Sequence, residues 1–146
     1  MHEPDPLELA RRLAEAYNRR DLDGIVSMYS ACAVWDMSEL GVGVLRGHDA
    51  IRHFLEGWFG GYEEFEFALE EVHDLGQGVG WAVVLPRGRP RGGSSFDEFR
   101  YGNCAVSEDD GLIERMVFST DVDAGRAAAE RLAEERRQNS ATEGSA

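Results

Sequence analysis

One predicted strand carries polar side chains at a spacing that could hold an oxygenated ligand. Along a strand over residues 95–106, the alternation of side chains places Asp97, Tyr101 and Asn103 on one face, together with Phe99. If this face lines a cavity, a carboxylate, a phenol and an amide would meet there. Such a wall suits a ligand with one or two oxygens on an otherwise apolar body. Alternatively, Tyr101 and Asn103 satisfy each other or a buried water.

A short strand over residues 33–37 offers a further carboxylate. We expect Trp35 and Met37 to point inward as core or cavity wall, which leaves Asp36 outward or at the rim. Asp36 stands beside Ser38 at the start of a glycine-rich segment, where an aspartate commonly turns the chain. Asp36 is therefore a candidate acid or base, with a turn as the alternative role.

Several other chemistries find no support in the sequence. The four histidines and two cysteines have no metal-ligand spacing, so we expect no metal site. We find no glycine-rich phosphate loop and no Gly-x-Ser-x-Gly elbow, and we expect no cofactor. Lysine does not occur in the sequence, which excludes Schiff-base chemistry.

The composition indicates one acidic globular domain. The 146 residues suffice for one core, and 28 acidic against 15 basic residues give a net charge of −13. Such a charge repels phosphates, so we expect neither nucleic acid nor an anionic membrane as a partner. The N-terminal residues do not resemble a leader, and we expect a cytoplasmic protein. Cys32 and Cys104 are too few for a disulfide framework and are expected to be reduced.

Hydrophobic periodicity predicts the elements that must position these residues. Helices are expected over residues 7–20, with Asp5 as N-cap and Pro6 in the first turn, over 21–29, and over 48–60. A glycine-rich loop is expected over 38–46. Strands are expected over 33–37, 65–73, 79–86, 95–106 and 112–120, and a last helix over 123–137. We expect one α+β domain over residues 1–137 and a disordered tail over 138–146.

Four sequence segments in this order carry a family resemblance. They are YNRRDLDGIVSMYS, AVWD, RGHDAIRHFLEGW and EDDGLIERMVFSTDVDA. Together they resemble the nuclear transport factor 2-like superfamily, in particular its SnoaL-like and ketosteroid-isomerase-like branch, over about residues 7–129. The resemblance implies a cone-shaped barrel of a curved antiparallel sheet wrapped around three N-terminal helices, plus a C-terminal helix. It also implies an apolar pocket and a homodimer packed through the sheet face.

The catalytic positions of two branches of the superfamily are not kept. Ketosteroid isomerase uses an aspartate base with a tyrosine and a protonated aspartate at its oxyanion site. The corresponding positions here are Met37, Leu13 and, for the oxyanion aspartate, a place near Asn103. Epoxide-hydrolase relatives need an Arg-x-Asp step, but Arg100 is followed two residues later by Gly102. Neither chemistry is therefore predicted.

SnoaL-like polyketide cyclases place an aspartate that acts as general acid/base near the end of the last strand. Asp121 stands at the matching position in VFSTDVDA. The same residue is also a natural N-cap for the helix that follows. The resemblance thus implies a catalytic Asp121, with helix capping as the alternative.

Two functional hypotheses remain. The first is a cofactor-free isomerase or cyclase for a small apolar carbonyl compound, with Asp121 or Asp36 as general acid/base and with Tyr101 and Asn103 stabilising an enolate. The second is a non-catalytic ligand-binding or dimerising scaffold. An enclosed pocket of about a few hundred Å³ would favour the first hypothesis, and a cone filled by Trp35, Trp58 and Phe59 would favour a dimerising scaffold. The ligand-binding residues predicted for it are Trp35, Met37, Phe54, Trp58, Phe59, Asp97, Phe99 and Phe118.

The segment PRGRPRGG is the one basic run in this acidic chain. Its arginines, Arg87, Arg89 and Arg91, could guide an anionic ligand. The alternative is a solvated hairpin loop made flexible by glycine and proline.

Overall fold

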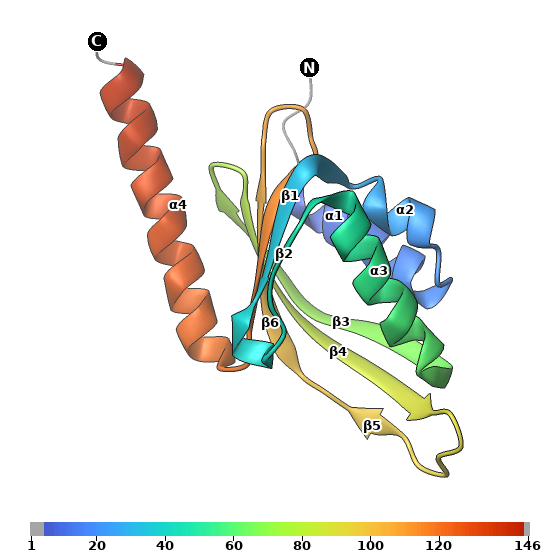
Figure 1. The fold of residues 1–146 in the computed structure, drawn as a ribbon. Helices are drawn as coiled ribbons and strands as arrows, with labels where there is room; N and C mark the ends of the chain where they lie inside the picture. The colour runs from blue at the N-terminus through green and yellow to red at the C-terminus, as the bar shows by residue number, and fades with distance from the viewer. Residues whose placement is uncertain (1–4, 145–146) are drawn as a thin grey trace.

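The computed structural model describes residues 5–144, with side chains up to residue 140. A curved sheet separates three helices on one face from a single long helix on the other (Figure 1). The elements are α1 (Pro6–Asn18), α2 (Leu22–Val26), β1 (Tyr29–Met37), the short 3-10 helix η1 (Ser38–Leu40), β2 (Gly43–Arg46), α3 (Gly47–Gly60), β3 (Tyr62–Gly76), β4 (Val79–Pro90), β5 (Asp97–Glu98), β6 (Tyr101–Ser107), β7 (Ile113–Ser119) and α4 (Val122–Gly144).

The sheet is mixed and unclosed. Its strand order is β2-β1-β7-β6-β4-β3, with β5 paired to β4. All strand pairs are antiparallel except β1 with β7. These two strands run parallel, which the long stretch of chain between them allows. The expected α+β cone is confirmed, with the corrections that one strand pair is parallel and that β2 and β3 remain as edges.

Polar side chains begin the first two helices as predicted. Asp5 accepts a hydrogen bond from Leu7 N at 3.0 Å, and Pro6 opens helix α1. Asp21 likewise accepts from Gly24 N at 3.0 Å and begins α2. Helix α2 is shorter than expected, because Tyr29 already belongs to strand β1.

We expected the glycine-rich segment 38–46 to be a loop, but it contains two regular elements. It forms η1 and then strand β2, which pairs with β1 so that Val44 faces Asp36 and Leu45 faces Trp35. Gly41 and Gly43 have φ of +79° and +93°, a backbone conformation that only glycine adopts at little cost. These two glycines let the chain reverse within a few residues.

The expected strand over 95–106 is broken in two. Strand β5 pairs with the far end of β4, β6 pairs with its near end, and Phe99 and Arg100 between them belong to neither strand. The strict alternation that joined Asp97 to Asn103 therefore does not hold across the break. Strands β3 and β4 are also longer than expected, and β4 includes part of the basic run.

The apolar core lies on both faces of the sheet. Helices α1, α2 and α3 enclose a large cluster with the inner sheet face, including Tyr17, Trp35 and Phe118. A second cluster lies between the outer face and α4, around Trp81 and Cys104. Cys104 is buried, Cys32 is exposed, and both are free thiols as expected.

Helix α4 continues well beyond the predicted end at residue 137. It runs to Gly144, and Arg136 Nε donates to Gln77 O at 2.9 Å while Ser140 Oγ donates to Gln77 Oε1 at 3.3 Å. Residues 138–144 are therefore helical, and the expected disordered tail is wrong there. Residues 1–4 of the expected domain and residues 145–146 of the expected tail lie outside the described residues. None of the helices within residues 5–144 has both the length and the apolar character of a membrane span.

Candidate functional site

A first cavity of about 50 Å³, chamber 1, lies between helix α1 and the inner face of the sheet. Its volume exceeds the roughly 10–15 Å³ that one water needs, and it is far below the few hundred Å³ of a site for a drug-sized ligand. Most of its wall is apolar. The polar side chains in the wall are Tyr17, Tyr29, Asn103 and Ser107.

Asn103 is the residue of chamber 1 whose hydrogen bonding is incomplete. It lies on β6 between Ala82 of β4 and Phe118 of β7. Its side-chain Oδ1 is buried and has no hydrogen-bond partner among the described residues. Leaving such a group unpaired costs about 1–3 kcal/mol, which a complementary ligand group can recover. A carboxamide offers both an acceptor and donors, so it can bind a hydroxyl or a carbonyl oxygen.

Trp35 is the second buried residue with an unpaired polar atom. The side chain is 1% exposed, and Nε1 has no hydrogen-bond partner among residues 5–140. The Tyr29 ring packs against the indole at a centroid distance of 5.6 Å. Burial raises the pKa of the Tyr29 hydroxyl, and the neighbouring indole N–H offsets only part of this rise. The contact between the two groups falls short of hydrogen-bond geometry.

A second cavity of about 90 Å³, chamber 2, lies on the other side of the aromatic core. Its wall contains six of the eight predicted ligand-binding residues, namely Trp35, Met37, Phe54, Trp58, Phe99 and Phe118, and also Tyr101. Val42 and Phe99 are 42% and 47% exposed. Chamber 2 thus has an apolar rim open to solvent.

The interior differs from the single large pocket that we expected. Tyr101 and Asn103 both lie on the inner face of β6, but they line different chambers. Asp97 is exposed on β5 and lines neither, because the chain breaks between β5 and β6. Phe59 is buried in the core against Tyr17 and also lines neither chamber. The prediction that Asp97, Tyr101 and Asn103 share one wall is therefore wrong.

Asp121 caps helix α4. Its Oδ1 accepts a hydrogen bond from Ala124 N at 3.0 Å, and its main-chain oxygen accepts from Gly125 N at 2.9 Å. The residue is exposed and lines neither chamber. The expectation that its carboxylate faces the cavity is wrong, and the capping alternative describes its contacts.

Asp36 turns the chain at the end of β1. Its Oδ1 accepts from Ser38 Oγ at 2.7 Å and from Ser38 N at 3.1 Å, and Arg115 lies 3.9 Å from Oδ2. These contacts, the Ser38 hydroxyl foremost, hold the pKa of the Asp36 carboxyl below its usual value. Asp36 therefore stays an anion outside both chambers, as the outward alternative predicted.

Neither chamber has a charged side chain in its wall, so phenols are the strongest donors there. Burial raises the pKa of the hydroxyls of Tyr17, Tyr29 and Tyr101 well above that of an exposed tyrosine. All three remain neutral near pH 7. Tyr17 and Tyr29 were absent from the predicted site. Tyr17 belongs to the apolar stripe of the first helix, and a hydroxyl on that inward face could have indicated a polar group in the interior.

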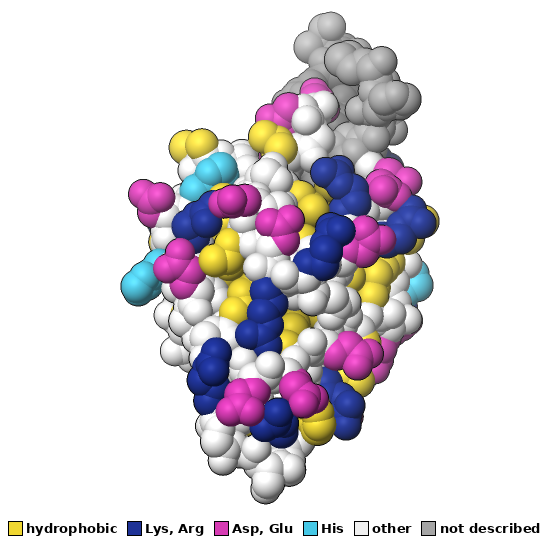
Figure 2. All heavy atoms as spheres, turned by 90° about the vertical axis from the view of Figure 1, so that its right-hand side faces the viewer, with side chains coloured by type: hydrophobic (Ala, Val, Ile, Leu, Met, Phe, Trp, Pro, Cys, Tyr) yellow, Lys and Arg dark blue, Asp and Glu magenta, His cyan; other side chains and the backbone are white. Residues whose placement is uncertain are grey.

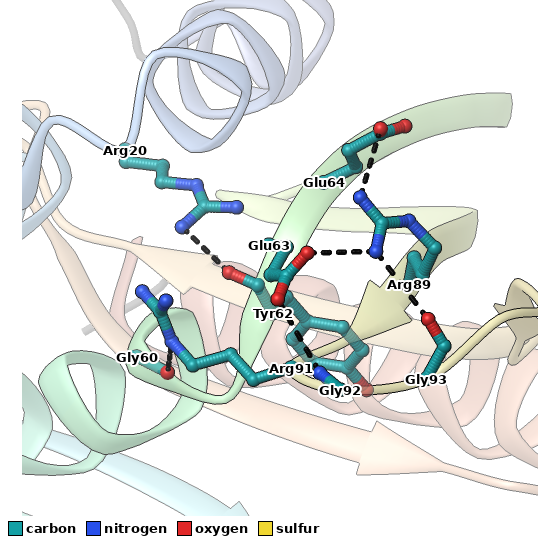
Figure 3. Close-up of polar contacts among 9 residues, drawn as sticks. All are labelled: Arg20, Gly60, Tyr62, Glu63, Glu64, Arg89, Arg91, Gly92 and Gly93. Carbon is teal, nitrogen blue, oxygen red and sulfur yellow. Dashed lines mark hydrogen bonds and ion pairs between the residues drawn. The ribbon is translucent and has the colours of Figure 1, made fainter.

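The basic run over residues 87–91 is bound within the fold. Arg89 forms ion pairs with Glu63 at 2.7 Å and Glu64 at 3.1 Å, and these contacts lower the pKa of Glu63 (Figure 3). Arg91 Nε donates to Gly60 O at 2.6 Å. Arg87 pairs with Glu98 at 3.3 Å. These arginines are therefore tied to the fold by their contacts and not carried on a free loop, although Arg87 and Arg91 are exposed to solvent as expected.

These contacts hold the C-terminal end of helix α3. Arg20 donates to Phe59 O at 3.1 Å and Tyr62 O at 3.0 Å, next to the bond from Arg91 to Gly60 (Figure 3). Guanidinium groups thus satisfy main-chain carbonyls that a helix end leaves unpaired. Because α3 supplies part of the wall of chamber 2, the arginines position that wall.

The surface over the helices carries charges of both signs. Arginine and carboxylate side chains are interspersed there, with apolar side chains between them (Figure 2). Within residues 5–140, no group of three or more His, Cys, Asp and Glu side chains is arranged to hold a metal ion.

Comparisons with known proteins identify the fold. The model of the SnoaL-like domain family matches residues 10–116. A search of curated protein sequences gives no match. Among solved structures, an NTF2-like protein of unknown function from Burkholderia pseudomallei is 21% identical, with a TM-score of 0.67 over 82% of this chain and 92% of that one.

Two similar structures contain small molecules. A protein with a ketosteroid isomerase-like fold from Catenulispora acidiphila, in complex with trimethylamine, is 10% identical with a TM-score of 0.68 over 78% of this chain and 85% of that one. A Mycobacterium tuberculosis protein in complex with estradiol-17beta-hemisuccinate is 16% identical with a TM-score of 0.66 over 77% and 91%. At these identities the likeness shows the fold alone.

Proposed function

The chain belongs to the SnoaL-like family, and on that premise we propose that it binds a small, neutral, largely apolar molecule with one oxygen in chamber 1. The observation that carries the proposal is the buried, unpartnered Oδ1 of Asn103 in an otherwise apolar wall. Filling the chamber would remove apolar surface from water, and the amide would fix the orientation of the ligand.

The chemistry of the wall supports a neutral ligand. Chamber 1 has no charged side chain, so an ion would lose its hydration without gaining a partner. The unpaired Oδ1 of Asn103 is an acceptor, so it suits a ligand that donates a hydrogen bond, such as an alcohol. The small-molecule complexes of two proteins with this fold support the use of the fold as a ligand site.

The geometry favours binding over the alternative of proton-transfer catalysis. A general acid or base must come within hydrogen-bond reach of the substrate. Asp121 caps α4 and Asp36 binds Ser38, so neither carboxylate faces a chamber. Asn103 and Tyr101, the proposed enolate-stabilising pair, line separate chambers. We therefore propose Asn103 as a ligand-orienting residue rather than a catalytic one.

The test compares two ligands of the same shape in two forms of the protein. Cyclohexanol and methylcyclohexane differ in a hydroxyl against a methyl group, and binding is followed by titration calorimetry or tryptophan fluorescence. We expect the alcohol, which can donate to Asn103 Oδ1, to bind roughly tenfold more tightly to the wild type, the value of one net hydrogen bond. The variant Asn103→Leu should abolish this preference and keep the affinity for the hydrocarbon.

Controls separate the binding role from folding. Asn103→Leu removes a buried unpaired amide, so its free energy of unfolding should equal or exceed that of the wild type. Asp121→Asn should retain the preference for the alcohol. A wild type that binds neither ligand, or that binds both equally, overturns the proposed function.

Homodimerisation through the sheet and a cytoplasmic location stay predictions, as does the absence of nucleic-acid and membrane partners. Helix α4 lies over β4, β6 and β7 on the outer face, around Trp81. Cys32 on β1 and Val44 on β2 are exposed. We propose that a dimer through the sheet would use the region of β1 and β2, and light scattering at micromolar concentration would test it.

A further inference from the structure

Two aromatic side chains stand between the two chambers. Tyr17 of α1 and Phe118 of β7 are the residues that line both chamber 1 and chamber 2. Each side chain is less than one tenth exposed. The two rings therefore form a partition across the interior of the cone.

The Tyr17 half of the partition is held firmly in place. Its ring stacks on Phe67, with centroids 4.6 Å apart and planes at 11°. The Trp58 ring meets it edge-on at 6.0 Å and the Phe59 ring lies at 5.8 Å. The next residue, Asn18, is hydrogen-bonded to the main chain of Phe67, so α1 and β3 move together at this point.

The Phe118 half belongs to the sheet. Its ring packs against Trp35 at 5.2 Å and against Tyr101 at 5.7 Å, both of which line chamber 2. Its register partner on β6 is Asn103, which lines chamber 1. A ligand bound to Asn103 therefore meets Phe118 and Tyr17 as soon as it extends toward chamber 2.

We propose that Tyr17, together with Phe118, sets the maximum length of the ligand by closing chamber 1 toward chamber 2. This inference rests on the proposed function. A molecule with its oxygen at Asn103 fits only if its apolar part ends before the partition. Removing the Tyr17 ring joins the two chambers into one elongated cavity, whose further wall is apolar apart from the Tyr101 hydroxyl and the indole N–H groups of Trp35 and Trp58.

The test measures the affinity for a series of 2-alkanols from 2-butanol to 2-dodecanol. Each methylene buried in an apolar site adds about fourfold to the affinity. In the wild type we expect the affinity to rise over the first members and then to level off or fall. In Tyr17→Ala and in the milder Tyr17→Leu, the rise should continue, so that the longest alcohols bind at least tenfold more tightly than to the wild type.

Matched variants separate a size filter from a general loss of packing. Phe118→Ala removes the other half of the partition and should extend the series in the same way. Phe59→Ala truncates a buried ring beside Tyr17 that lines neither chamber, and should lower stability without changing the length dependence. The same length dependence in the wild type and in the Tyr17 and Phe118 variants overturns this inference. Failure of the wild type to bind any of these alcohols overturns the proposed function instead.

Discussion

The side chain of Asn18 exchanges two hydrogen bonds with the main chain of Phe67. Asn18 Nδ2 donates to Phe67 O at 3.1 Å, and Phe67 N donates to Asn18 Oδ1 at 2.7 Å. The carboxamide thus occupies the place that a neighbouring strand would take on the free edge of β3. The contact fixes the end of helix α1 against the sheet. It thereby also fixes the position of the neighbouring Tyr17 side chain in the interior.

Asn18→Ala should destabilise the fold more than an ordinary substitution at a partly exposed position does. It leaves a main-chain donor and acceptor of β3 unpaired, and we expect a loss of about 1–3 kcal/mol in the free energy of unfolding. Urea denaturation of Asn18→Ala, with Asn18→Asp as a variant that keeps the acceptor alone, measures it. A loss under about 0.5 kcal/mol in Asn18→Ala would show that the paired bonds contribute little net stability.

Replacing either of two helical glycines by alanine should change the free energy of unfolding, but in opposite directions. A Cβ at Gly125 of α4 would lie 2.6 Å from the Ser119 Cβ and 2.8 Å from Trp81, whereas one at Gly57 of α3 would meet nothing within 4 Å. Gly57→Ala should therefore stabilise the protein by up to about 1 kcal/mol through helix propensity. Gly125→Ala should destabilise it by about 1–3 kcal/mol through overpacking.

Thermal and urea unfolding of the two glycine variants check this pair. Because the same substitution is made in α3 and in α4, the difference between the two changes in the free energy of unfolding reports the close packing of α4 on the outer sheet face. Equal effects in both variants would contradict that packing.

Asp121 should matter for stability and not for ligand binding. Asp121→Ala removes the N-cap of α4 and should cost about 1 kcal/mol, while Asp121→Ser keeps a capping oxygen and should cost much less. Urea denaturation gives the stabilities, and calorimetry with cyclohexanol gives the affinities. Weaker binding of the alcohol to the well-folded Asp121→Ser would show that Asp121 contributes to the ligand site.

The buried thiol of Cys104 should make stability fall in alkaline solution. Burial raises its pKa from 9.0 to about 11, so the folded state keeps a proton that the unfolded state releases. The stability from this group is complete below pH 9.0 and is lost as the pH rises from there toward 11. Between pH 8 and 10, the wild type should therefore lose about 1 kcal/mol more than Cys104→Ala.

Urea denaturation of both proteins across this pH range gives the difference directly. Cys32 is exposed and should react quickly with a thiol reagent in the folded protein, which makes Cys32→Ser the matched control. Parallel pH curves for the wild type and Cys104→Ala would contradict the burial of this thiol.

The sequence predicts the elements well where the signal is local. The caps Asp5 and Asp21 and the apolar periodicity of α1 and α3 depend on neighbouring residues, and both caps were confirmed. The order of the quoted segments then identified the family, which the match over residues 10–116 confirmed. Strand β2 was missed, because its short sequence follows glycines and becomes a strand only by pairing with β1.

The candidate site was harder to predict because it depends on how strands break and rings pack. The break at Phe99 and Arg100 moved Asp97 away from Asn103, and nothing in the local pattern indicated it. The division of the cone depends on Tyr17 and Phe118, which come from opposite ends of the chain. The direction of Asp121 was a choice between two roles that the residue type serves equally well.

The most direct test of the account observes the Asn103 side chain while a ligand binds. In a ¹⁵N-labelled sample, the side-chain amide resonances of Asn103, assigned with Asn103→Leu, are followed during titration with cyclohexanol and with methylcyclohexane. We predict that the alcohol shifts these resonances far more than the hydrocarbon, because only its hydroxyl bonds to the carboxamide. Alcohol binding that leaves the Asn103 resonances in place would contradict the account.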